Sequence, residues 1–137
     1  MRKTAPEGVE FLGRVPDAEM GALYRESRAL LFPAMEDFGI VPLEAMASGR
    51  AVIAYGRGGA LDTVRDGETG VLFDAQTPEA LTAAMERFEA EVEPALDPAV
   101  PAAQAARFSA KAFRAAMWAE IRGMAPGLTL PDAQPAG

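Results

Sequence analysis

A chain of 137 residues, 50% of them hydrophobic, is long enough to fold as one domain around its own core. Its formal net charge of −7 argues against nucleic acid or anionic lipid as a partner, because both require a basic surface. The sequence contains neither cysteine nor histidine, which excludes disulfides, thiolate metal sites and the commonest general base, and which favours a cytoplasmic protein.

The first part of the chain predicts a strand, a helix and a second strand. VEFLG, from Val9 to Gly13, has the apolar composition of a short strand. Pro16 and Asp17 can cap a helix. Its apolar face is expected to carry Met20, Leu23 and Tyr24. The run ALLF, from Ala29 to Phe32, is too short for a helix and is stopped by Pro33, so it predicts a buried strand.

Glycine and proline punctuate the middle of the chain. A helix is predicted over 40–48; its proline is tolerable only in the first turn, which places the helix start near Gly39 and its C-terminal cap at Gly49. AVIAY, residues 51–55, is a continuous apolar strand. The glycines of GRGG then make a tight turn into a short helix at 60–64, and DGETG turns the chain into the strand VLF.

Two further helices are predicted in the second half. Thr77 and Pro78 form the cap and first turn of one. Its apolar positions, expected to cover a sheet face, are Leu81, Ala84, Met85, Phe88 and Val92. Prolines break the chain before a last helix from about Ser109. Its stripe of Phe113, Met117 and Ile121 predicts core or interdomain packing rather than a membrane face.

Short apolar strands that alternate with helices predict an α/β fold, with a Rossmann-like parallel sheet, flanking helices and right-handed crossovers. Residues 1–122 are expected to form one partial domain and residues 123–137 a disordered tail. In such sheets a ligand binds outside the carboxyl ends of the strands. The loops after Phe32 and Tyr55 are therefore the expected location of a site.

Two glutamates lie where such a site would form. Glu36 follows the strand at 29–32, and Glu44 lies one turn into the next helix among apolar residues, from which it can lean back toward the loop. Carboxylates accept hydrogen bonds from the paired hydroxyls of a ribose or hexose, and free amides near Phe38, Gly39 and Ile40 suit a phosphate. A structural interpretation stays open, in which Glu44 is solvated and Glu36 belongs to a polar turn that favours the helix dipole.

The stretch FPAMEDFGIVPLEAMASGRAVIAYGRGGALDTVRDGETGVLF resembles the signature of family-four retaining glycosyltransferases, whose hallmark is E-x-F-G-(I/L)-x-x-x-E. The residues that match this hallmark are Glu36, Phe38, Gly39, Ile40 and Glu44. The similarity runs from about Val9 to Phe88, with the paired glutamates, the GG turn and the DGETG turn in the family's order. The chain therefore resembles the C-terminal, donor-binding half of a GT-B enzyme.

The resemblance implies a role for each matched residue. Glu36 would contact the transferred sugar and steady the charge developing on it, as the candidate catalytic residue. The amides of Phe38, Gly39 and Ile40 would receive sugar or diphosphate oxygens, and Glu44 would bind the ribose hydroxyls. The family works without a divalent metal at the sugar site, which agrees with a sequence that has no Asp-x-Asp pair and no histidine. Neither a metal nor a cofactor is expected.

The GRGG turn, residues 56–59, does not fit the dinucleotide fingerprint, because its third glycine is out of place. We interpret it as a strand-to-helix turn rather than a phosphate cradle, with Arg57 as a solvated residue and Asp66 as turn chemistry only. AYGRGGALDTV resembles mannosyltransferases of polysaccharide assembly within the family, which implies GDP-mannose as a candidate donor.

A full family member has two Rossmann-like domains, so the resemblance implies an N-terminally truncated chain with little or no transferase activity of its own. Its expected partners are a nucleotide sugar, and either the missing N-terminal domain or a second copy that covers open strand edges. No apolar run approaches the roughly 20 residues that cross a bilayer, and the start lacks the apolar segment of a signal peptide. Peripheral membrane association would therefore come only through the missing domain. A noncatalytic sugar-nucleotide-binding fragment and a relative such as a sugar-nucleotide epimerase are the alternatives.

Overall fold

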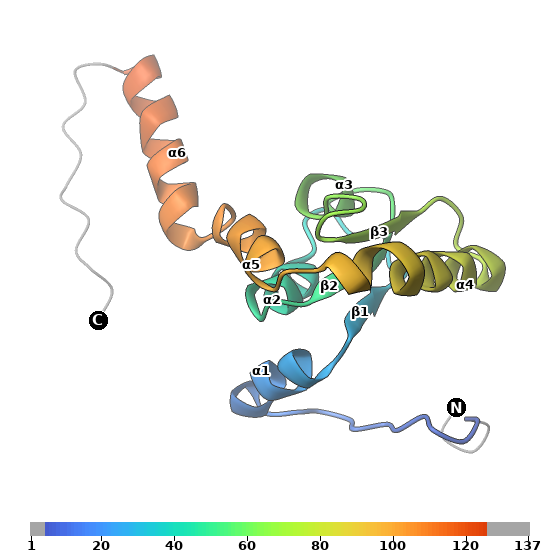
Figure 1. Ribbon diagram of the computed structural model, residues 1–137. Coiled ribbons are helices and arrows are strands. Elements are labelled where there is room, and N and C mark those ends of the chain that lie inside the picture. Colours follow the sequence, from blue (N-terminus) through green and yellow to red (C-terminus); the bar gives the residue numbers. More distant parts are fainter. Residues whose placement is uncertain (1–4, 126–137) are drawn as a thin grey trace.

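Three parallel strands form the centre of the computed structural model, which describes residues 5–125 (Figure 1). They are β1 (Ala29–Phe32), β2 (Ala51–Tyr55) and β3 (Gly70–Phe73), in the order β1-β2-β3. The pairing is close where Val52 faces Gly70, since a Cβ on Gly70 would lie 1.9 Å from the Val52 carbonyl oxygen. The predicted parallel sheet and the strands at 29–32 and 51–55 are confirmed. The expectation that the strand at 29–32 is buried is wrong, because β1 is an edge strand of the sheet within residues 5–125 and Leu31 is 43% exposed.

Helices pack around this sheet or, in the case of the last one, extend from it. They are α1 (Asp17–Glu26), α2 (Ile40–Ala47), α3 (Ala60–Thr63), α4 (Pro78–Arg87), α5 (Ala99–Ala106) and α6 (Ala110–Met124). A π-helical turn, η2 (Phe88–Val92), and a 3-10 turn, η3 (Glu93–Ala95), continue α4. α2 ends at the predicted cap, Gly49, and the N–H groups of Gly49 and Arg50 bond the carbonyls of Met46 and Ala45 in a Schellman motif.

Alternate residues of β2 supply two separate cores. Val52 and Ala54 pack with a cluster beneath α2, α3 and α5. That cluster also contains Phe32, Ala45, Met46, Ala60, Val64 and Ala105. Ala51 and Ile53 face the other way, onto α4 and η2. Their partners are Val71, Phe73, Ala84, Phe88 and Val92, so the predicted helix does cover a sheet face.

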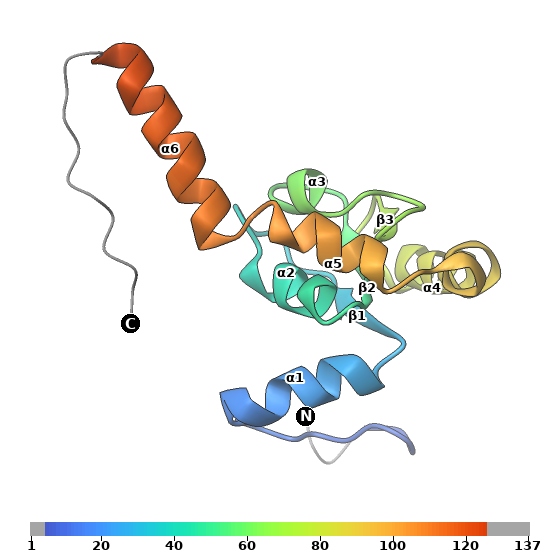
Figure 2. The same cartoon turned by 60° about the vertical axis from the view of Figure 1, so that its left-hand side comes forward.

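The strand predicted at Val9–Gly13 is absent from the described residues. The segment is irregular and exposed, with Phe11 46% and Leu12 51% accessible. It runs past α1 and away from the sheet (Figures 1 and 2). A strand requires a neighbouring strand to satisfy its backbone. Within residues 5–125, β1 pairs only with β2, and this segment does not join its free edge.

Helix α5 corrects the expectation that the prolines before Ser109 break the chain. Pro98 is its N-cap and Pro101 lies in its first turn, where an amide hydrogen has no helical partner to lose. The buried Gln104 side chain donates to the carbonyl of Thr63 at 3.0 Å, which ties α5 to α3. Prolines here begin a helix rather than prevent one.

Helix α6 begins after Ser109 as predicted, and its N-cap hydroxyl accepts from the Ala112 N–H. It projects away from the sheet in both views, and none of its residues is buried (Figure 2). Phe113 and Met117 are 61% and 45% exposed, so the stripe does not pack into the core of this chain. α6 ends at Met124, two residues inside the expected tail, and residues 126–137 of that tail lie outside the described part. Over residues 5–125, no helix is both long and apolar enough to cross a membrane.

Candidate functional site

The loop between β1 and α2 forms the floor of the candidate site. It carries Glu36 at the carboxyl end of the sheet, as predicted from the strand order. Residues 35–41 line a concavity of about 510 Å³, and this set includes four of the five predicted positions: Glu36, Phe38, Gly39 and Ile40. The structure therefore brings the first glutamate and the three amide positions together.

The backbone of this loop leaves hydrogen-bond donors free. Gly39 is the N-cap of α2 with φ 75° and ψ 74°, a left-handed conformation that suits glycine. Within residues 5–125, the N–H groups of Phe38, Gly39 and Ile40 have no hydrogen-bond acceptor. They lie at the positive end of the α2 dipole, so the loop offers uncommitted donors and a favourable potential to an anion.

Two contacts hold the loop in place. The Gly59 N–H donates to the Glu36 carbonyl at 2.8 Å, and the Gln76 side-chain amide donates to the Pro33 carbonyl at 2.7 Å. The glycines of the 56–59 turn make the first contact possible, because a Cβ on Gly58 would lie 2.4 Å from the Glu36 carbonyl oxygen. The turn is thus a strand-to-helix turn, as interpreted, whose small residues also support the glutamate loop.

Glu44 lines a different and larger concavity of about 810 Å³, between α2 and the junction of α5 with α6. Phe38 and Ile40 line both concavities, so the concavity of Glu36 and the concavity of Glu44 are neighbours. Most of the wall of this larger concavity is apolar, and it includes Leu43, Phe108 and Phe113. The rings of Phe38 and Phe108 meet edge to face, with centroids 6.1 Å apart.

The Glu44 side chain is exposed but not free. The hydroxyl of Tyr24, from α1, donates to its Oε2 atom at 3.2 Å. Burial, followed by the charge of Glu44 and this hydrogen bond, raises the pKa of the Tyr24 phenol above its ordinary value. Glu44 therefore accepts a hydrogen bond from the protein at Oε2, and its Oε1 atom can accept one from a ligand.

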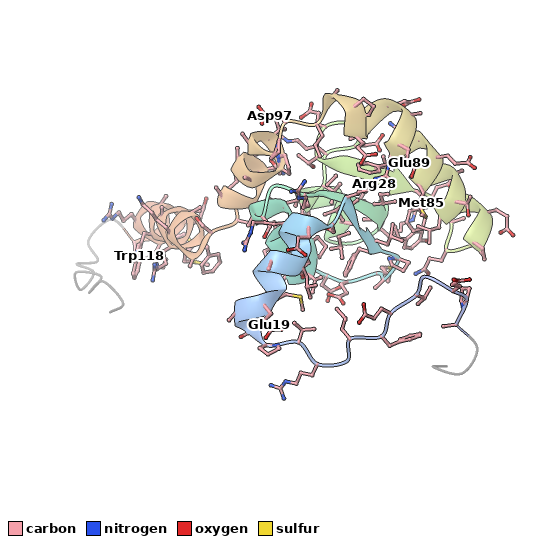
Figure 3. All side chains as sticks on the ribbon, turned by 60° about the horizontal axis from the view of Figure 1, so that its bottom comes forward. Glu19, Arg28, Met85, Glu89, Asp97 and Trp118 are labelled. Carbon is pink, nitrogen blue, oxygen red and sulfur yellow. The ribbon has the colours of Figure 1, made fainter. Side chains whose placement is uncertain are left out.

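Other charged residues serve the scaffold. Asp66, expected to be a turn residue only, also accepts two-pronged hydrogen bonds from Arg87 at 2.9 and 3.0 Å. Although burial alone would raise it, the bonds from Arg87 and from the Leu72 N–H lower the pKa of the Asp66 carboxyl. Arg28 lies beside Glu89, with Met85 nearby (Figure 3), and its bonds to Glu93 and Glu89 hold the segment before β1 against η2 and η3.

The sequence did not indicate three of the site's supports: Tyr24, Gln76 and the close approach of the 58–59 turn. Tyr24 and Glu44 are 20 residues apart, and Gln76 and Pro33 are 43 apart, so no local pattern joins them. The glycine spacing was the available signal for the third. Adjacent glycines after a strand permit close approach by another backbone as well as a tight turn.

Comparisons with known proteins indicate the family and the fold. The family model described as "Glycosyl transferases group 1" matches residues 3–102. D-inositol 3-phosphate glycosyltransferase from Corynebacterium glutamicum (strain R) is 42% identical over 73 residues, which are 53% of this chain and 18% of that protein. Alpha-1,3/1,6-mannosyltransferase alg-2 from Neurospora crassa is 47% identical over 73 residues, which are 52% of this chain and 16% of that protein.

Among solved structures, sucrose-phosphate synthase from Thermosynechococcus elongatus superposes with a TM-score of 0.73 and 28% sequence identity. The match covers 87% of this chain and 31% of that one. The chain thus spans less than a third of the length of each of these three proteins.

Proposed function

Because the chain belongs to the group 1 glycosyl transferase family, we propose that it is the donor-binding part of a hexosyltransferase that uses a nucleoside-diphosphate sugar. The observation that carries the proposal is the loop of residues 35–41, where uncommitted N–H groups at the start of α2 lie beside Glu36. A diphosphate needs donors and positive potential, whereas a sugar needs acceptors for its hydroxyls. This loop offers both within one concavity.

In the proposed reaction, the bond between the sugar and the diphosphate breaks, and negative charge grows on the departing phosphate oxygen. The N–H groups of Phe38, Gly39 and Ile40 stabilise that charge, and they need no rearrangement because they have no other acceptor within residues 5–125. Glu36 accepts hydrogen bonds from the sugar and steadies the positive charge that develops on its ring. Glu44 accepts from the ribose hydroxyls.

Several finer points belong to the same proposal. Retention of the anomeric configuration and metal-independent donor binding are proposed from the resemblance of the paired-glutamate motif to family-four retaining glycosyltransferases, and a sequence with no Asp-x-Asp pair and no histidine agrees with the second. Mannose is the proposed sugar, supported by the mannosyltransferase among the relatives. Acceptor binding is proposed to come from a second Rossmann-like domain outside this chain, since the matched relatives are several times longer.

Calorimetry with UDP-, GDP- and ADP-sugars tests the proposal on the purified chain. Glu36→Ala and Glu44→Ala should each weaken binding of the preferred donor at least tenfold, about 1.4 kcal/mol. Glu120→Ala, on the exposed face of α6, is the matched control and should bind as the wild type does. Chelation with EDTA should leave the affinity unchanged. The proposal fails if both site variants bind as the control does.

A noncatalytic donor-binding module that acts with a separate polypeptide is the second candidate, favoured by the 16% to 18% of the curated relatives that the chain spans. In both cases the chain alone is expected to bind donor without transferring sugar. Turnover of any sugar nucleotide by the purified chain would contradict that expectation.

A further inference from the structure

One side chain outside the glutamate motif reaches into the candidate site. Tyr24 lies on α1, and its ring packs against the core cluster beneath α2. Its hydroxyl is therefore held by a half-buried ring, and it donates to Glu44 Oε2 at 3.2 Å. Glu44, by contrast, is exposed on α2, where a glutamate side chain has several accessible rotamers.

We propose that Tyr24 is a positioning residue for Glu44: its anchored hydroxyl fixes one carboxylate oxygen so that Oε1 faces the two ribose hydroxyls of the donor. The inference rests on the proposed function. An exposed glutamate that must become ordered when it binds loses rotamer freedom at that moment. A hydrogen bond already present in the free protein reduces this loss, because the carboxylate starts in the orientation that binds the diol.

The protonation states fit this role. An ionised carboxylate only accepts hydrogen bonds, so the phenol must remain protonated to donate. Burial of Tyr24, with the neighbouring Glu44 charge, raises the pKa of the phenol, and the donor stays in place at neutral and mildly alkaline pH. A ribose diol could then donate to Oε1 without competing with the tyrosine.

A purely structural role is the alternative, since the same bond also joins α1 to α2. α1 has a second attachment, from the Arg50 guanidinium to the Arg25 carbonyl. Tyr24→Phe keeps the packed ring and removes only the hydroxyl, so α1 should stay docked. Tyr55→Phe is the matched control, because no hydrogen bond of the Tyr55 hydroxyl is found within residues 5–125.

The test compares each of UDP, GDP and ADP with its 2′,3′-dideoxy counterpart, by calorimetry on the 137-residue chain. The wild type and Tyr55→Phe should prefer the ribose form at least tenfold, and Glu44→Ala should lose that preference. Tyr24→Phe should reduce the preference to threefold or less, while its affinity for the dideoxy form and its circular dichroism spectrum stay unchanged. A measure of preference separates the positioning of Glu44 from a general loss of folding.

Two different failures are distinguishable. If the wild type prefers ribose and Tyr24→Phe prefers it equally, the positioning role is wrong while the proposed function stands. If the wild type shows no ribose preference, or Glu44→Ala keeps it, the proposed function falls and the inference with it. Ultraviolet titration gives a ligand-free check: in a Tyr55→Phe background, Glu44→Gln should lower the pKa of the remaining phenol, and an unchanged value would overturn the contact.

Discussion

Replacing Gly59 by alanine tests how the glutamate loop is supported. Gly59 has φ −61° and ψ −17°, which alanine adopts without strain, so the substitution changes only the space available. An added Cβ would lie 2.6 Å from the Asp37 carbonyl oxygen, and 2.6 Å from both the Cα and the carbonyl oxygen of Phe38. All three atoms are backbone, so no side chain can rotate away to relieve the overlap.

The size of the effect follows from these distances. Ordinary contact begins at 3.4 Å, so the turn and the loop must separate by about 0.8 Å. That movement stretches the 2.8 Å bond from the Gly59 N–H to the Glu36 carbonyl. Overpacking costs about 1–3 kcal/mol and a weakened hydrogen bond about 1 kcal/mol. We expect the free energy of unfolding to fall by about 2–4 kcal/mol, and donor affinity to fall at least tenfold because the displaced loop carries Glu36.

Urea unfolding followed by circular dichroism measures the first quantity, and calorimetry with the preferred sugar nucleotide measures the second. Gly123→Ala is the matched control, since its Cβ would meet nothing within 4 Å and it lies on α6, which has no buried residue. The control should unfold and bind as the wild type does. A Gly59→Ala chain within about 0.5 kcal/mol of the wild type, with wild-type affinity, would refute the reasoning.

Three further substitutions test the scaffold. Asp66→Asn should lower the free energy of unfolding by about 1 kcal/mol or less, because Asp66 and its partner Arg87 are both more than a third exposed. The folded-state pKa of Asp66 is lowered, so its contribution to stability is present above the ordinary aspartate pKa and is lost as the pH falls through the lower folded value. The urea midpoints of the wild type and the variant should therefore converge in acid. Thr77→Ala removes the cap of α4 and should lower the free energy of unfolding by about 1 kcal/mol, whereas Ser109→Ala at the unpacked α6 should lower only its helical signal; equal global losses would contradict this. Phe88 is 2% exposed, so Phe88→Ala should lower the free energy of unfolding by about 3–5 kcal/mol. A loss of less than about 1 kcal/mol would place Phe88 outside the core.

Local sequence signals predicted those parts of the fold that depend on a few neighbouring residues. The cap at Thr77, the start of α2 at Gly39 and its end at Gly49 are confirmed, because each is decided within one turn of chain. The Rossmann-like parallel sheet of the C-terminal half of a GT-B enzyme is also confirmed, by the strand order and by the likeness to sucrose-phosphate synthase.

The errors have a shared physical cause. Val9–Gly13 has the composition of a strand, but a strand exists only beside a partner, and composition does not say whether one is near. Pro98 and Pro101 are expected to break the chain, but they begin α5, because a proline's effect depends on whether it falls in the first turn of a helix or later. The local pattern specifies neither the partner that a strand needs nor the point at which a proline-containing helix begins.

The candidate site, too, is predictable from the sequence only in part. The motif located Glu36, Phe38, Gly39, Ile40 and Glu44 in sequence, and four of them share one concavity. The roles of these residues stay predictions. The hydroxyl of Tyr24 on Glu44 and the amide of Gln76 on Pro33 join residues distant in sequence, so only the folded chain reveals them.

The most direct test of the central claim is to follow the amide resonances of the ¹⁵N-labelled chain while the preferred sugar nucleotide is added. If a diphosphate sugar binds at the start of α2, the N–H signals of Phe38, Gly39 and Ile40 should move together and saturate at one affinity, while those of α6 stay fixed. Saturating shifts that avoid these three amides would contradict the account, because the donor would then bind elsewhere on the chain.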